Sequence, residues 1–226
     1  MEPHKTHITV DIEPSFDQGP LEYFIRARKF AYQNYAEEIK RISSVRLENV
    51  DEHTFFREYL WTVHTTGFSA KAVGKFFDRL AHAYGRYDVL ASESFQDACA
   101  RVRQVCNNPS KIMSVHMTSR LIRDGIAEHG WEGFRAQSLS SPELLKKLPY
   151  VGKITCFHLA RNIGLLDSVK PDLHLIRMAE HWGFEDCNSM CQSMQQDGMP
   201  LGIIDLILWY SASTFGTGSI KKDGQR

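Results

Sequence analysis

One stretch of the chain combines a turn that could hold an anion with a carboxylate that could stabilise a cation. Residues 148–155 read LPYVGKIT, which places Pro149 and Gly152 in a turn just before a predicted helix. The first amide groups of a helix have no partner within it, and its N-terminal end is partially positive, so the turn offers a grip for a phosphate. Asp172 begins the next predicted helix. A carboxylate fixed there could stabilise a sugar that becomes cationic when a bond at its anomeric carbon breaks.

This hairpin followed by an aspartate resembles the helix–hairpin–helix superfamily of DNA glycosylases, and within it the endonuclease III-like branch. Other segments match in the same order: 60–73 is similar to the helix–loop–helix that opens the family domain, and 201–209 to the helix that closes it. The resemblance covers residues from about 50 to 215. It implies an all-α fold of two helical lobes with the active-site cleft between them and the helix–hairpin–helix motif at about 141–163.

The resemblance also implies a domain organisation in which the chain leaves one lobe and returns to it. Residues 1–50 would form an N-terminal segment and a helix that packs with the C-terminal lobe. Residues 50–165 would form the lobe that ends in the helix–hairpin–helix, and 166–215 the loop of the aspartate and the C-terminal helices. The tail 216–226 is expected to be disordered. Apolar residues recur at helical spacing almost throughout, and this periodicity predicts helices over 21–42, 52–66, 70–84, 94–106, 110–129, 141–147, 153–163, 173–182, 187–196 and 201–214.

Asp172 is the catalytic residue that the resemblance implies. A glycosidic bond to a base breaks with oxocarbenium character at the sugar, so a nearby carboxylate can stabilise the transition state and orient the attacking water. Aspartate is also a favoured cap for a helix such as the one that Leu173 begins. The two roles are compatible, because a cap position would fix the carboxylate. Arg177 matches an arginine at that spacing in the family, and we expect it to contact DNA.

The position after Gly152 predicts the reaction type. Bifunctional members of the family place a lysine two residues beyond this glycine, where its amine forms a Schiff base with the sugar. Here Ile154 occupies that position, and Lys153 lies one residue earlier, about 100° away around the helix. We therefore expect a monofunctional glycosylase that leaves an abasic site. Two alternatives stay open: a bifunctional glycosylase/AP lyase that uses Lys153, and a non-catalytic helix–hairpin–helix module that only binds DNA.

The hairpin is expected to hold DNA through the backbone amides of Val151 to Lys153. Tyr150 replaces the first hairpin glycine of the family pattern, whereas Gly152 retains the second. The residues expected to contact DNA are Tyr150, Val151, Gly152, Lys153, Thr155, Lys146, Lys147 and Arg177. The family further implies a monovalent cation held by hairpin carbonyls. Formal net charge is zero, but basic residues cluster around the hairpin, which favours one DNA-facing side.

A base in duplex DNA must be flipped out before it can be excised, and another group must fill the gap. By resemblance the filler comes from the loop 66–68. Gly67 has no side chain, so Phe68 is the predicted apolar wedge, with ordinary core packing as the alternative. Trp61 stands where the adenine-specific branch has a glutamate, which argues against that specificity. The candidate residues of the base pocket or wedge are Phe68, Gly67, His64, Trp61 and Glu58.

The sequence does not name the excised base. The departures in the loop favour a base other than adenine or the standard oxidised pyrimidines. Three classes stay open: a bulky or hypermodified base of viral DNA, which would make the protein an antiviral defence enzyme; an alkylated base; and a deaminated or mismatched pyrimidine.

Composition limits the remaining classes. The chain has 42% hydrophobic and 24% charged residues, as in ordinary globular proteins, and shows neither a long apolar run nor a signal-peptide pattern. We therefore expect a cytoplasmic protein that binds no membrane. The resemblance implies that it binds double-stranded DNA, and we expect a monomer. Many members of the family that the chain resembles hold an iron–sulfur cluster with four C-terminal cysteines. Here the five cysteines form no CxxC pair and none follows Cys191, so we expect no such cluster, no other cofactor and no catalytic metal. Cys187 and Cys191 are predicted to be reduced and buried on one helix face.

Overall fold

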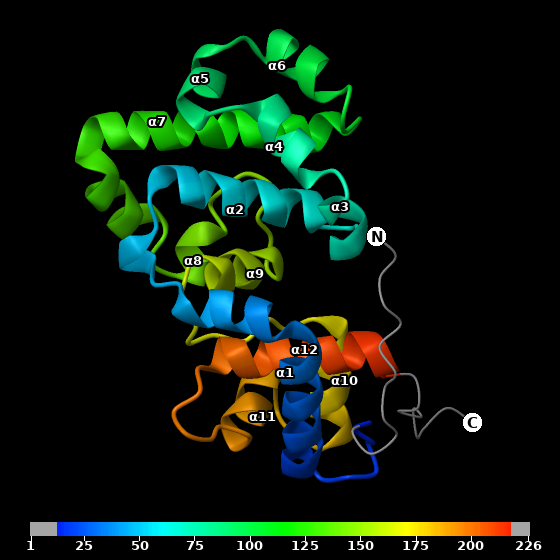
Figure 1. Cartoon of the computed structure of the whole chain (residues 1–226). Helices are drawn as coiled ribbons and strands as arrows, with labels where there is room; N and C mark the ends of the chain where they lie inside the picture. Colours follow the sequence, from blue (N-terminus) through cyan, green and yellow to red (C-terminus); the bar gives the residue numbers. More distant parts are fainter. Residues whose placement is uncertain (1–12, 218–226) are drawn as a thin grey trace. The chain divides into compact units, whose positions relative to one another are not determined.

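The computed structural model describes residues 13–217, and over this range the chain consists of helices and loops without a strand (Figure 1). The predicted all-α class is confirmed. The helices in chain order are α1 (Pro20–Ser44), the 3-10 turn η2 (Leu47–Asn49), α2 (Glu52–Thr65), α3 (Ala70–Gly74), α4 (Phe77–Tyr84), α5 (Tyr87–Ser92), α6 (Phe95–Val102), α7 (Pro109–Ser138), α8 (Pro142–Leu145), α9 (Thr155–Asn162), α10 (Leu173–His181), α11 (Cys187–Ser193) and α12 (Leu201–Phe215). None of these helices combines the length and apolar character that crossing a bilayer requires.

The described chain divides into two compact units. Residues 45–165 form one of them, here called the central unit, and residues 13–44 together with 166–217 form the other, called the terminal unit. The terminal unit is therefore assembled from both ends of the described chain. Part of the predicted disordered tail, residues 218–226, lies outside the described residues. Thr217, assigned by the prediction to that tail, is buried.

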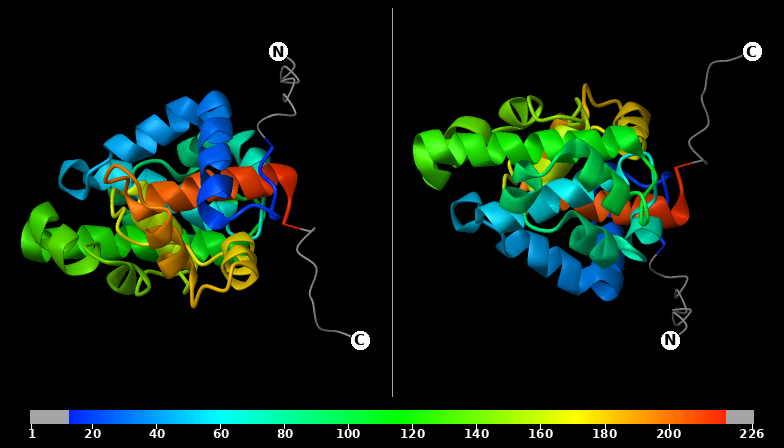
Figure 2. Two further views of the ribbon diagram at one scale, coloured as in Figure 1. Left: turned by 90° about the horizontal axis from the view of Figure 1, so that it is seen from below. Right: turned by 90° about the horizontal axis from the view of Figure 1, so that it is seen from above.

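The terminal unit is built around α12. This helix is apolar on nearly every side, and α1, α10 and α11 all pack against it (Figure 2). A helix that is apolar all round has to be enclosed by others, because no face of it favours water. Gly202 lets the start of α12 approach the chain leaving the central unit: its amide donates to the Leu166 carbonyl over 2.8 Å, and a Cβ there would lie 3.2 Å from the same oxygen.

The core of the central unit lies where α2 packs against α7 and α9. Three large side chains of α2, those of Phe55, Tyr59 and Leu60, are almost completely buried in it. The long helix α7 bends at Gly130, whose φ of 68° is left-handed and interrupts the helical backbone. The sequence predicted the straight part of α7 but not its continuation beyond this glycine.

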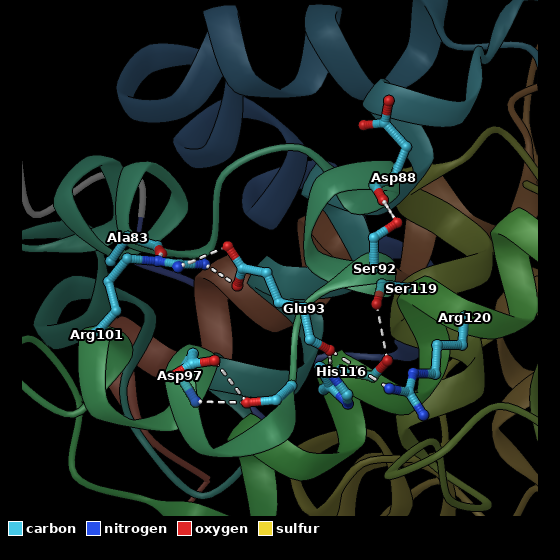
Figure 3. A network of polar contacts seen from close by, with 10 residues as sticks. Ala83, Asp88, Ser92, Glu93, Asp97, Arg101, His116, Ser119 and Arg120 are labelled. Atoms are coloured by element: carbon cyan, nitrogen blue, oxygen red, sulfur yellow. Dashed lines mark hydrogen bonds and ion pairs between the residues drawn. The ribbon is translucent and has the colours of Figure 1, made fainter.

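A polar network fixes the outer helices of the central unit to α7 (Figure 3). The Glu93 carboxylate accepts two hydrogen bonds from the Arg101 guanidinium, over 2.8 and 2.7 Å, and Arg101 Nε donates to the Ala83 carbonyl over 2.6 Å. The Glu93 carbonyl lies 3.1 Å from His116 Nε2 and accepts from Arg120 over 3.4 Å. The loop between α5 and α6 is thereby fixed to α4, α6 and α7.

Candidate functional site

The hairpin between α8 and α9 is held firmly in the central unit. Ser141 caps α8 by accepting from the Leu144 amide over 3.3 Å, as the sequence predicted, and Pro142 is the first helical residue. The turn is closed by the Val151 amide, which donates to the Leu148 carbonyl over 3.1 Å. The Tyr59 hydroxyl donates to the Pro149 carbonyl over 2.6 Å, which ties the hairpin to α2.

Unpaired amide groups follow the turn. The N–H groups of residues 152–155 form no hydrogen bond within the described chain, whereas that of Val151 is used in the turn. The predicted set of Val151 to Lys153 is therefore wrong at Val151, because closing the hairpin consumes its N–H, and the unpaired set reaches Thr155. Gly152 is exposed, and a Cβ at this residue would meet no protein atom within 4 Å. This space is open to an approaching ligand.

Tyr150 adopts an unusual backbone conformation at the tip of the hairpin. Its φ is 65°, in the left-handed region, which costs a residue with a Cβ about 1–2 kcal/mol. Glycine adopts this conformation more easily than a residue with a Cβ. Tyr150 is 39% exposed.

The side chains predicted to contact DNA differ in whether they form ion pairs or hydrogen bonds within the protein. Lys147 and Lys153 are exposed and form no ion pair among the described residues, while Lys146 pairs with Glu143. Thr155, half-buried, begins α9. Arg177 belongs to the terminal unit, where its guanidinium donates to the Thr217 hydroxyl over 3.3 Å. His174 Nδ1 lies 3.2 Å from the same hydroxyl.

Asp172 caps α10 in the terminal unit. Its Oδ1 accepts hydrogen bonds from the amides of His174 and Leu175, over 3.0 and 3.2 Å. Its Oδ2 lies 3.7 Å from Lys170 Nζ, and 13% of the side chain is exposed. The cap role that the sequence predicted is present. Oδ1 is committed to the helix end, and Oδ2 faces the Lys170 ammonium.

Lys170 and Asp205 support this carboxylate and were not singled out by the sequence patterns. The Lys170 amide donates over 2.9 Å to Oδ2 of Asp205, which lies buried in α12. The backbone before Asp172 is thereby attached to the central helix of the unit. The spacing Lys-Pro-Asp at 170–172 was a usable signal for Lys170, because Pro171 between them restricts the backbone. Asp205 lies far along the chain, and no local pattern pairs it with Lys170.

Cys187 and Cys191 lie on one face of α11, and both are buried, as predicted. Burial is the main cause that raises the pKa of the Cys187 thiol to about 12, and the nearby charge of Asp172 adds to it. Burial likewise raises the pKa of Cys191. Both side chains are neutral thiols at physiological pH. Within the described residues no cluster of His, Cys, Asp and Glu could hold a metal ion.

The candidate pocket and wedge residues are all in the central unit. Phe68 is 62% exposed, so the alternative of ordinary core packing is wrong, and Gly67 before it is left-handed at φ 78°. Trp61 is half-buried against Phe77, and Glu58 accepts from the Asn162 side chain over 2.9 Å.

His64 lies in the core, which corrects its assignment to the base pocket. Its side chain is buried between the Tyr84 hydroxyl, 3.0 Å from Nε2, and Cys106 Sγ, 3.7 Å from Nδ1. Burial, and secondarily the charge of Lys111, lowers the pKa of His64 to about 4. It is a neutral core residue because α2 turns this face inward. An open pocket of about 430 Å³ between α2 and α4 contains none of the five predicted residues, and its lining includes His53, Arg57, Asp78, His82 and Arg86.

Comparison with known proteins gives a likeness of fold. No protein-family model matches the sequence, and no curated protein gives a significant match. Among solved structures the chain is similar to the Methanocaldococcus jannaschii 8-oxoguanine glycosylase/lyase in complex with a 15mer DNA containing 8-oxoguanine. The identity is 16%, the TM-score is 0.55, and the match covers 88% of this chain and 99% of that chain. At this identity the comparison establishes that the two chains share a helical fold.

Proposed function

We propose that this protein is a DNA N-glycosylase that hydrolyses the N-glycosidic bond of a damaged or modified base and leaves an intact abasic strand. Asp172 carries the proposal. Two backbone amides fix its carboxylate through Oδ1, and Oδ2 lies 3.7 Å from Lys170 Nζ. A rigidly held negative charge is what a developing oxocarbenium ion requires. The unpaired amides after the hairpin support the DNA-binding part of the proposal.

Hydrolysis by water, without strand cleavage, is part of the proposal. Ile154 at the family's Schiff-base position has no nucleophile. A lyase reaction is nevertheless the second candidate, because the Lys170 amine lies 3.7 Å from the Asp172 carboxylate. Borohydride trapping on the true substrate separates the two candidates. We expect no covalent protein–DNA adduct; an adduct that disappears in Lys170→Met or Lys153→Met would identify a lyase and its amine.

A monovalent cation at the hairpin fits the groups that the turn provides. The Val151 carbonyl accepts no hydrogen bond within the described chain, and that of Leu148 accepts one, so both retain lone pairs. When bound, the cation would add positive charge where the hairpin meets a phosphate. No other cofactor is proposed, and neither is an iron–sulfur cluster.

The test of the proposed function is release of a free base. The protein is incubated with duplexes that carry natural bases, alkylated bases, deaminated or mismatched pyrimidines, 8-oxoguanine and hypermodified bases of viral DNA, and released bases are identified by mass spectrometry. Release of a hypermodified viral base would support a role in antiviral defence. Release of no base from any duplex would leave the non-catalytic DNA-binding module as the function.

Asp172→Asn is the decisive variant in the same assay. Asparagine caps a helix as well as aspartate does, so the change removes the charge and retains the fold. We expect the rate of base release to fall by about 10²- to 10³-fold or more, with DNA affinity retained. Asp167→Asn, an exposed aspartate in the same connection, is the matched control. Equal rates for Asp172→Asn and the wild type would reduce Asp172 to a structural cap.

A further inference from the structure

A buried lysine connects two loops of the central unit. Lys111, in the first turn of α7, is 1% exposed, and its ammonium donates to the carbonyls of His64 and Thr66 over 3.0 and 2.7 Å. Both carbonyls belong to the C-terminal end of α2, where a cation is favoured. The partners of its ammonium are backbone carbonyls, and burial lowers the pKa of Lys111. The ammonium therefore fixes the start of the loop that carries Phe68.

The same ammonium lies over two aromatic rings. Lys111 Nζ is 4.7 Å from the centroid of the Phe68 ring and 5.7 Å from that of the Tyr150 ring. Both distances are within the range of cation–π attraction. The rings come from different segments, one from the loop after α2 and the other from the hairpin tip, and the ammonium is a common point between them.

Both residues remain partly in solvent, with 62% of Phe68 and 39% of Tyr150 exposed. Neither side chain belongs to the buried core. Tyr150 is held in a left-handed backbone conformation that glycine or asparagine would adopt more easily, and such strain is typical of residues kept for a function.

We propose that Phe68 and Tyr150 form a stacking site for an unpaired DNA base, with Lys111 as its positioning residue. The proposal rests on the proposed glycosylase function, since extrusion of a base leaves its partner unpaired. Aromatic faces bind unpaired bases by stacking, whatever the base. Phe68 alone was the expected wedge; the structure adds Tyr150 as a second ring and an ammonium that holds both in place. The unpaired amides beside Tyr150 would hold the adjacent phosphate.

Binding to two duplexes tests this site independently of base release. One duplex is fully paired, and the other carries a tetrahydrofuran abasic analogue opposite 2-aminopurine, whose fluorescence reports stacking. We expect the wild type to prefer the second duplex and to change the 2-aminopurine emission. Tyr150→Asn and Phe68→Ser should each reduce affinity for that duplex about tenfold and leave affinity for the paired duplex nearly unchanged. Tyr150→Phe should retain the preference.

Controls separate the stacking site from folding and from the proposed function. Asparagine tolerates the left-handed conformation, so Tyr150→Asn removes the ring without straining the turn. Tyr32→Asn, an exposed tyrosine of α1, should behave like the wild type. Lys111→Met should reduce the preference for the abasic duplex, whereas a merely structural lysine would weaken binding to both duplexes equally.

The outcomes that overturn the site are specific. The site is overturned if the wild type does not prefer the abasic duplex to the paired duplex. It is also overturned if this preference survives in both Tyr150→Asn and Phe68→Ser. A wild type that shows the preference but releases no base from the panel would contradict the glycosylase and leave the stacking site standing.

Discussion

Gly152 lies where the hairpin leaves open space, and a single methyl group can test that space. A Cβ there would meet no protein atom within 4 Å, and the backbone is not left-handed. Gly152→Ala should therefore leave the free energy of unfolding unchanged or raise it by up to about 1 kcal/mol. DNA affinity should fall about tenfold, because the methyl group occupies the space of an approaching phosphate. Fluorescence anisotropy measures the affinity, and Gly19→Ala is the control. Unchanged affinity would remove the hairpin from the interface.

His64 gives a second residue-scale prediction, for stability against pH. Its pKa is lowered from 6.5 to about 4 in the folded protein. The unfolded chain therefore takes up the proton first, so the stability present above pH 6.5 is lost as the pH falls toward 4. At pH 5 this loss is about 2 kcal/mol. Urea unfolding at pH 7.5 and at pH 5 gives the free energy of unfolding at each pH. The decrease between the two pH values should be about 2 kcal/mol smaller in His64→Gln than in the wild type. An equal difference in both proteins would contradict the lowered pKa.

At the scale of elements, the network around Glu93 predicts a stability effect away from the candidate site. Arg101→Met removes the paired hydrogen bonds to Glu93 and the bond to the Ala83 carbonyl. The Arg101 side chain is 40% exposed, so solvent screening limits the loss to about 1 kcal/mol of unfolding free energy. Arg103→Met, at an exposed position of the same segment, should cost less than about 0.5 kcal/mol. Chemical denaturation measures the free energy of unfolding of both variants. Equal losses in Arg101→Met and Arg103→Met would show that the network does not stabilise the unit.

The elements that local patterns encode were predicted, and those that depend on distant contacts were not. Ser141 before Pro142 and Asp172 before Leu173 are local capping signals, and both helices begin where these residues indicate. The predicted helix 70–84 is instead two helices, α3 and α4, and α5 was missed because its six residues are too few for a periodic pattern. The Lys111 contacts could not be predicted, since its partners come from two segments far away in the sequence.

At the scale of the whole molecule, zero net charge and a locally basic hairpin together predict how DNA binding responds to salt. Each phosphate that a cationic side chain neutralises releases counterions, so affinity should fall as salt rises. Lys147→Ala should make the slope of log affinity against log salt shallower by about 1. Lys40→Ala in α1 should leave the slope as it is. Titrations at several salt concentrations give the slopes, and an unchanged slope for Lys147→Ala would place this lysine away from the phosphates.

The assembly of the terminal unit from both ends of the described chain has a consequence for biosynthesis. Helix α1 emerges from the ribosome before α12, against which it packs, and the whole central unit is synthesised between them. The central unit is contiguous and can fold while synthesis continues. During that interval the buried face of α1, with Tyr23 and Phe24, lacks its α12 partner. A nascent chain stalled before residue 201 should therefore expose this face to chaperones and proteases, and synthesis through α12 should protect it.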